Sequence, residues 1–183
     1  MQIYIRKQFG NPILRKVGKK LTIEEIKSSE LKLVINNMKN TLSKKKYGIG
    51  LAAPQIGKSI ALAVISLKPT PTRPNLQNLN MTLVNPKITK RYGKTTKMWE
   101  GCISGPNLYG QALRYKKIKL KWQDEQANQN EKIFKDILAQ VIQHEVDHIN
   151  GILFVDRVKD TKTFITFSEY KKLRKKENIT KKP

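Results

Sequence analysis

The most informative stretch of the chain is Gln143-His144-Glu145-Val146-Asp147-His148, which reads H-E-x-x-H and holds both histidines of the sequence. In an α-helix, positions i and i+4 share a face, so both imidazoles can point at one metal ion while Glu145 stays near a water bound to it. Gly151 stands where such a helix would stop. Apolar residues recur around the motif at helical spacing: Phe134, Ile137, Leu138, Val141, Ile142 and Ile149. The pattern favours a metal-binding helix over a polar stripe on a surface helix.

Length and composition limit the class of protein. At 183 residues the chain is predicted to form one domain with an ordinary hydrophobic core. No apolar run approaches the roughly 18 residues that span a bilayer, so we expect a soluble protein. A single cysteine excludes an internal disulfide and fits a reducing compartment. The net charge of +23 favours contact with a polyanion such as RNA, although solvated surface lysines would give the same count.

Short helices and strands are predicted along the rest of the chain. Thr22-Ile23-Glu24-Glu25 matches a capping box, and an amphipathic helix is predicted from residue 30 to about residue 45. Apolar runs or alternation predict three strands, at 60–67, 81–92 and 115–122. The remaining segments are predicted to be a loop at 68–80, a polar turn at 124–130, a strand or extended turn at 151–157 and a basic tail at 170–183.

Cys102 is the residue that could complete a metal site. Its thiol has three interpretations, namely a buried hydrophobe, a nucleophile or a metal ligand, and a nucleophile would need a histidine base that the motif already uses. A catalytic metal site keeps three protein ligands and one open position, and its ion lowers the pKa of bound water toward about 7. Glu145 is placed to act as general base and then acid. The Gln55 amide and the Ile103 backbone N–H are candidate donors to an oxyanion.

Two acidic residues near these positions leave alternatives open. Glu100 and Asp147 could orient the ligand histidines, and they could equally form ordinary salt bridges.

The stretch from Gly48 to Gln55 contains a G-x-G, but no strand precedes it and no third glycine follows at dinucleotide-binding spacing, so a Rossmann site is rejected. Its glycine and alanine residues would let a backbone come close to a ligand.

The sequence resembles the peptide deformylase family, metallohydrolases that remove the formyl group from the initiator methionine of new proteins. The resemblance also includes residues 10–15 and 151–157 and covers nearly the whole chain except the basic tail. Three separated motifs carry it in family order: Gly48-Ile49-Gly50-Leu51-Ala52-Ala53-Pro54-Gln55, Glu100-Gly101-Cys102-Ile103-Ser104 and Gln143-His144-Glu145-Val146-Asp147-His148.

The resemblance implies a fold, a domain organisation and a reaction. The fold would be α+β, with antiparallel β-sheets wrapped around a central metal-binding helix and with an N-terminal helix. Residues 1–169 would form the catalytic domain and residues 170–183 a basic C-terminal tail. Formyl-Met nascent peptides would be the substrates, and formate and a free amine the products.

The same resemblance assigns roles to particular residues. One divalent ion, Fe²⁺ in the cell with Zn²⁺, Ni²⁺ or Co²⁺ able to replace it, would be bound by three ligands: Cys102, His144 and His148. The catalytic residues would be Glu145, Gln55 and the Ile103 N–H. The substrate peptide would bind the Gly50 backbone, and its methionine side chain would enter an apolar pocket lined by Ile49, Ile137 and Val141.

Four positions depart from the family pattern. Ile103 replaces the usual leucine, and Gly105 stands where a branched apolar residue is common, so that segment is expected to be looser. Tyr109 occupies the position of an arginine near the substrate, and Gln140 that of a helix arginine. These changes leave an alternative open: a weakly active or altered-specificity deformylase-like protein with a ribosome- or RNA-binding role.

A second alternative is a zinc endopeptidase in which Glu169 supplies the third ligand. That interpretation leaves Cys102 and the Gly48–Gln55 stretch without a role.

The basic surface predicts contact with the ribosome, and the chain is expected in the cytoplasm, or in an organelle if a presequence was removed. No membrane association is expected. The sequence does not predict the oligomeric state.

Overall fold

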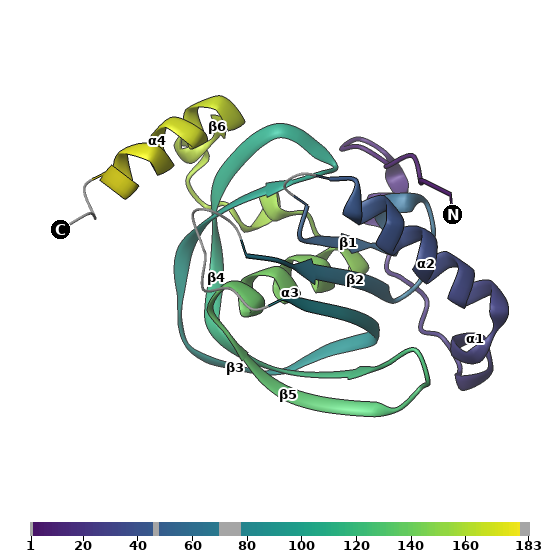
Figure 1. The fold of residues 1–183 in the computed structure, drawn as a ribbon. Helices are drawn as coiled ribbons and strands as arrows, with labels where there is room; N and C mark the ends of the chain where they lie inside the picture. The colour runs from purple at the N-terminus through teal and green to yellow at the C-terminus, as the bar shows by residue number, and fades with distance from the viewer. Residues whose placement is uncertain (1, 46–47, 70–77, 180–183) are drawn as a thin grey trace.

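The computed structural model describes residues 2–45, 48–69 and 78–179. Within these ranges the chain has an α+β fold, in which one antiparallel sheet of order β1-β2-β3-β4-β5, with β6 on β4, curves around helix α3 (Figure 1). The predicted fold class is therefore confirmed. The strands are β1 (Gly50–Ala52), β2 (Leu62–Leu67), β3 (Leu79–Cys102), β4 (Gly105–Gln123), β5 (Gln129–Lys135) and β6 (Ile165–Thr166).

Four α-helices and four short 3₁₀ helices complete the described structure. The α-helices are α1 (Ile23–Lys27), α2 (Ser29–Ser43), α3 (Asp136–Ile149) and α4 (Phe167–Ile179). The 3₁₀ helices are η1 (Pro12–Arg15), η2 (Ala53–Ile56), η3 (Phe154–Arg157) and η4 (Thr161–Thr163). None of the helices in the described ranges is long and apolar enough to cross a membrane.

The N-terminal helices form where the sequence predicts them. The Thr22 side chain accepts the Glu25 backbone N–H while the Glu25 carboxylate accepts the Thr22 backbone N–H, so the predicted capping box is present. Ser28 then caps α2. The apolar face of α2 is buried against β1 and β2, which places this helix on the outside of the sheet.

Strands β3 and β4 form a long hairpin that extends well beyond the predicted segments 81–92 and 115–122. The register shifts between Tyr92 and Thr95, around Gly93 with a positive φ of 71°, and again between Gly101 and Cys102. Such bulges break the alternation of inward and outward residues, which explains why the sequence pattern did not predict strand there. The hairpin ends with Cys102 opposite Gly105.

Two predicted boundaries beside the metal-binding helix are wrong. Residues 129–135 form the edge strand β5, so Phe134 belongs to a strand and α3 begins at Asp136. Phe134 is the only residue of β5 that is buried, and a mostly polar edge strand shows little hydrophobic pattern. The segment 151–157, predicted to be extended, instead contains the 3₁₀ helix η3, in which Phe154 is buried.

Helix α3 lies inside the curved sheet and is buried on several faces. Its apolar residues pack with β2, β3 and β4 in one cluster, while its polar residues Gln143, Glu145, Asp147 and His148 are also buried. A helix that buries this many polar groups must satisfy them within the protein or with a ligand. Helix α4 begins at Phe167 and therefore runs across the predicted boundary between residues 169 and 170.

Candidate metal centre and active site

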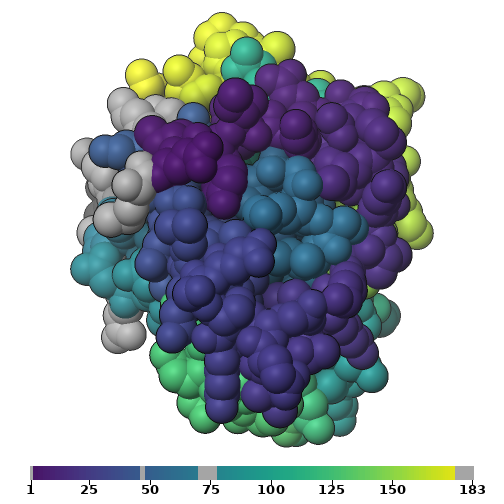
Figure 2. Space-filling model, turned by 90° about the vertical axis from the view of Figure 1, so that its right-hand side faces the viewer, coloured from purple at the N-terminus to yellow at the C-terminus, as the bar shows by residue number. Residues whose placement is uncertain are grey.

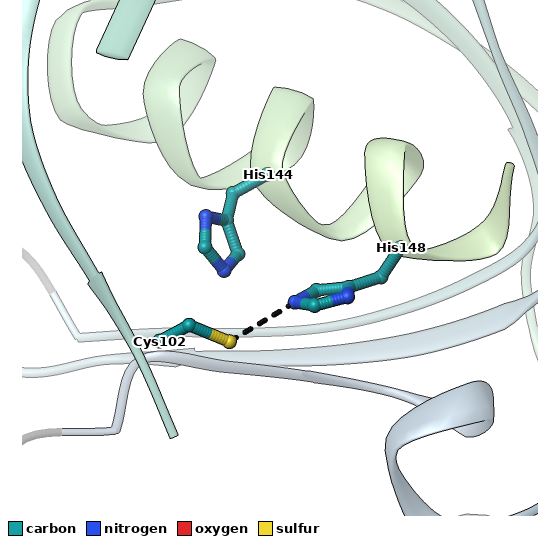
Figure 3. Close-up of side chains that lie close together, drawn as sticks. All are labelled: Cys102, His144 and His148. Carbon is teal, nitrogen blue, oxygen red and sulfur yellow. Dashed lines mark hydrogen bonds between the residues drawn. The ribbon is translucent and has the colours of Figure 1, made fainter. Parts of the chain in front are cut away.

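Three side chains from two elements converge on one point. His144 and His148 project from the same face of α3, and Cys102, the last residue of β3, faces them (Figure 3). One ligand atom from each of the three residues lies within 4.8 Å of the other two, and the Cys102 Sγ is 3.1 Å from the His148 Nε2. A thiolate and two imidazoles are donors typical of a catalytic transition-metal site. The donor set therefore fits a divalent ion, as the sequence predicts.

The Cys102 thiol is held in the form that binds metals. Burial opposes its ionisation, but the positive charge of His148 and hydrogen bonds from both histidines outweigh burial and lower the pKa of the thiol well below its ordinary value. The Gln55 Nε2 and the Ser104 backbone N–H each donate to Sγ at 3.4 Å. These two donors fix the direction of the sulfur and favour its negative charge.

Glu100 orients His144, as one of its two predicted roles requires. Its Oε2 lies 3.0 Å from the His144 Nδ1, so it can hold the ring with the other nitrogen toward Cys102. The Arg114 Nε donates to the Glu100 Oε1 at 2.8 Å, and the Arg114 Nη2 donates to the Glu100 Oε2 at 2.9 Å. Burial alone would raise the pKa of Glu100, but His144 and Arg114 lower the pKa to about 2, so the carboxylate stays ionised.

Asp147 has the other predicted role, that of an ordinary salt bridge. Its carboxylate pairs with Arg114 and, at 2.7 Å, with Arg157, and it forms no hydrogen bond with His148 among the described contacts. The His148 Nδ1 is buried without a partner in the described part of the chain. Arg114 links the two carboxylates and is 2 % exposed, so removing it would take a charged partner from two buried carboxylates at once and leave them only His144 and Arg157. Arg114 belongs to none of the three motifs and was not among the residues predicted from the sequence.

Glu145 lies against the Gly50 backbone. A Cβ at Gly50 would come within 2.6 Å of the Glu145 carboxyl carbon, so only glycine leaves room for this side chain. Burial raises the pKa of Glu145 to about 7 against the opposing charges of the histidines. Its Oε2 has no hydrogen-bond partner in the described ranges. The carboxylate is thus a buried acceptor beside the metal ligands, able to take up and return a proton.

Both predicted oxyanion donors lie next to Cys102. The Gln55 Oε1 accepts the Ala52 N–H at 2.8 Å, and its Nε2 donates to the Ser104 Oγ at 3.1 Å, so the amide is held with its donor toward the sulfur. Ile103 follows Cys102 in the tight turn between β3 and β4. The structure brings both residues to the metal site.

The residues predicted to bind substrate fall into two groups. Ile49, Ile137 and Val141 belong to one apolar cluster that includes the metal-binding helix, as expected for a common pocket. Tyr109 lies elsewhere, at a cavity that also includes Cys102 and Ile103. Its ring stacks on Phe167 and Tyr170 of α4 with centroid distances of 5.3 and 4.5 Å. The C-terminal helix therefore forms part of the surroundings of the site.

Gly105 and Gln140 have structural explanations. The Phe9 ring lies 2.6 Å from the position that a Cβ on Gly105 would occupy, so an aromatic side chain from the N-terminal segment fills the space expected to be loose. The Gln140 Nε2 donates to the Trp99 carbonyl at 3.0 Å and approaches the Glu100 Oε1 at 3.3 Å. Both departures are compatible with the metal site.

The polypeptide deformylase family model matches residues 5–164. The chain belongs to the peptide deformylase family. It is 34% identical over 167 residues to peptide deformylase 2 of Nostoc sp., covering 91% of this chain and 92% of the relative, and 38% identical over 159 residues to the peptide deformylase of Leptospira biflexa, covering 86% and 88%. As a deformylase, it is a metal-dependent hydrolase.

Solved deformylase structures have the same fold. A class I type b peptide deformylase from Acinetobacter baumannii with bound Met-Ala-Ser superposes with a TM-score of 0.80 at 31% identity, covering 85% of this chain and 98% of that one. The peptide deformylase from Thermotoga maritima gives a TM-score of 0.77 at 33% identity, covering 87% and 100%. None of these comparisons favours the alternative of a weakly active protein with a ribosome- or RNA-binding role.

The third metal ligand can be tested against the endopeptidase alternative. Cys102 lies with the histidines, whereas Glu169 is an exposed residue of α4 that pairs with Lys172. We expect Cys102→Ala to lower the metal content well below one ion per chain, because one of three ligands is lost. Glu169→Ala is the matched control and should keep the ion. Elemental analysis after dialysis measures both, and the reverse result would support the endopeptidase.

Proposed function

We propose that the protein removes the formyl group from the N-terminal methionine of nascent proteins, with Glu145 as its catalytic acid and base. The observation that supports this role is the buried Glu145 carboxylate, which lies against Gly50 on the residue next to the ligand His144 and has an oxygen free of partners in the described part of the chain. A bound ion would be held by Cys102, His144 and His148, and it would supply Lewis acidity to water and to the formyl carbonyl.

In this reaction, the residues of the chain transfer one proton from water to the leaving amine and stabilise the negative charge that develops on the formyl oxygen. Glu145 takes a proton from the attacking water as the oxygen bonds to the formyl carbon, and it gives this proton to the amine nitrogen as the C–N bond breaks. The negative charge on the formyl oxygen is met by the Gln55 amide and the Ile103 N–H. Formate and a peptide with a free amine leave. The Gly50 backbone would bind the peptide, and Ile49, Ile137 and Val141 would receive the methionine side chain.

We further propose Fe²⁺ as the ion in the cell, with Zn²⁺, Ni²⁺ or Co²⁺ able to replace it. One thiolate and two imidazoles can bind several first-row transition-metal ions, so the ion that is bound depends on which metal the cell makes available. The test is formate release from formyl-Met-Ala-Ser by anaerobically purified protein, with metal analysis of the same sample. One formate per peptide, in proportion to bound iron, is expected. An iron-loaded protein that releases none would reject the proposed reaction.

The basic surface supports a proposed contact with ribosomal RNA in the cytoplasm. On one side of the sheet, lysines face each other across neighbouring strands, and opposed like charges destabilise a sheet. Glu131 pairs with Lys119 and Lys121, and the excess of positive charge that remains would attract a polyanion. The Nζ atoms of Lys90 and Lys117 lie 5.1 and 4.7 Å from the centroid of the Tyr92 ring. The opposed pairs are Lys87–Lys121, Lys90–Lys119 and Lys117–Lys135.

The tail offers a separate test of this contact. Deleting the residues after Tyr170 removes a cluster of basic residues but keeps the ring that stacks on Tyr109. We expect weaker, less salt-dependent binding to ribosomes because fewer counterions are released, and unchanged hydrolysis of a small formyl-peptide. Cosedimentation with ribosomes at two salt concentrations measures the binding. A chain with Lys171, Lys172 and Lys175 changed to Gln separates charge from helix length. Unchanged, salt-independent binding would reject the contact.

A further inference from the structure

A short N-terminal segment lies across the two elements that carry the proposed oxyanion donors. This segment, residues 6–9, is called the strap. The Lys7 N–H donates to the Gln55 carbonyl at 2.7 Å, and the Phe9 N–H donates to the Ser104 carbonyl at 2.9 Å. In Figure 2 the N-terminal residues, in the darkest purple, lie on the surface beside the blue segment that follows residue 50. The strap thus connects η2 with the turn between β3 and β4.

Arg6 adds a side-chain contact at the turn itself. Its Nη1 donates to the Ile103 carbonyl at 3.0 Å. The Ile103 carbonyl and the Ile103 N–H belong to adjacent peptide units that meet at the Ile103 Cα, so a bond that fixes the carbonyl anchors the turn directly beside the N–H. The guanidinium also lines the cavity that contains Cys102 and Tyr109, so it reaches the site from the protein surface.

Packing fixes the strap closely against the turn. The Phe9 ring occupies the space beside Gly105, where a Cβ would lie 2.6 Å from the ring. At the other element, a Cβ on Gly57 would lie 3.0 Å from the Lys7 Cε. A larger residue at Gly105 would displace the ring, whereas the flexible end of Lys7 could move aside at Gly57. The contacts of the strap are backbone bonds, one guanidinium bond and close packing of Phe9 at the turn.

We propose that the strap, with Arg6 as its main positioning residue, sets the distance between the Gln55 amide and the Ile103 N–H. The two donors come from elements far apart in the sequence, and the direct links between those regions are the bonds from the Gln55 Nε2 to the Ser104 Oγ at 3.1 Å and to the Cys102 Sγ at 3.4 Å. Oxyanion donors act only when both reach the developing charge, and a misplacement of about 1 Å can cost roughly 100-fold in rate. This inference rests on the oxyanion roles proposed above.

The test replaces Arg6 with Met, which keeps the length of the side chain but cannot donate. We expect kcat for formyl-Met-Ala-Ser to fall about 10- to 100-fold while KM stays within about twofold, because the donors matter most in the transition state. Arg6→Lys keeps one donor and should recover most of the loss. Arg15→Met is the matched control, since Arg15 pairs with Asp156 away from the donors. Metal content is measured for every variant.

Hydrogen exchange gives a second readout that a general loss of stability would not produce. In Arg6→Met, amides of residues 101–105 should exchange faster, while those of α3 stay unchanged. A raised KM with normal kcat would overturn the proposal in favour of a direct substrate contact. Faster exchange throughout the chain would also overturn it.

Gln55→Ala distinguishes the strap from the reaction that it is proposed to serve. If Gln55→Ala lowers kcat and Arg6→Met does not, the strap has no positioning role and the oxyanion assignment stands. If neither variant lowers kcat in the metal-loaded protein, the oxyanion assignment fails and the strap proposal fails with it. The proposal requires both variants to lower kcat and Arg6→Lys to restore it.

Discussion

Glu145→Gln should lower kcat by about three to four powers of ten and leave the metal in place. The amide has nearly the size of the carboxylate, so it fits beside Gly50, but it cannot take a proton from water and pass it to the leaving amine. The three ligands are untouched. Steady-state kinetics with formyl-Met-Ala-Ser, on samples of known metal content, measures the effect.

A control separates this loss from a general change of charge. Glu169→Gln removes the same charge from an exposed position on α4 and should leave kcat within about twofold, as surface substitutions usually do. If the Glu145→Gln protein turned over at a near-normal rate with its ion bound, another group would have to move the proton. Loss of the ion itself would show instead that Glu145 supports the site structurally.

The parts of the fold that the sequence predicts are those with a regular hydrophobic period. The α2 helix and the α3 helix show it, and the capping box at Thr22 marks a start by side-chain chemistry alone. Strand β5 and the middle of the β3–β4 hairpin do not show it. The first is a mostly polar edge, and the second is interrupted by a bulge at Gly93, so neither alternates cleanly.

In the site, likewise, some residues could be predicted from the sequence and others could not. Metal ligands and the catalytic carboxylate stand in short motifs, so the sequence alone could place them. The role of Asp147 could not be decided, because Asp147 lies on α3 and its partner Arg114 on β4, and the two meet only when the helix packs against that strand. One signal was present: Arg114 has the same strand alternation as the buried Ala112 and Ile118, which puts a charged group on the inward face. A buried arginine requires anionic partners.

Gly50→Ala should reduce kcat by about 100-fold or more without removing the ion. The new methyl group would take the space that the Glu145 carboxyl occupies, so the carboxylate must turn away from its place beside the ligands. Gly50 lacks the positive φ that would itself disfavour alanine, so β1 should still pair with β2. Kinetics, metal content and the melting temperature are measured together. An unchanged kcat would mean that Glu145 works equally well from another position.

A double-mutant cycle identifies the cause of this loss. In a Glu145→Asp background the carboxylate is one methylene shorter and no longer reaches as far toward position 50, so Gly50→Ala should cost much less there than in the natural chain. Non-additivity of this kind shows that the two residues act through one contact. Purely additive effects would instead assign the loss to the peptide-binding backbone of β1. The coupling free energy from this cycle then measures how much the contact between Gly50 and Glu145 contributes to catalysis.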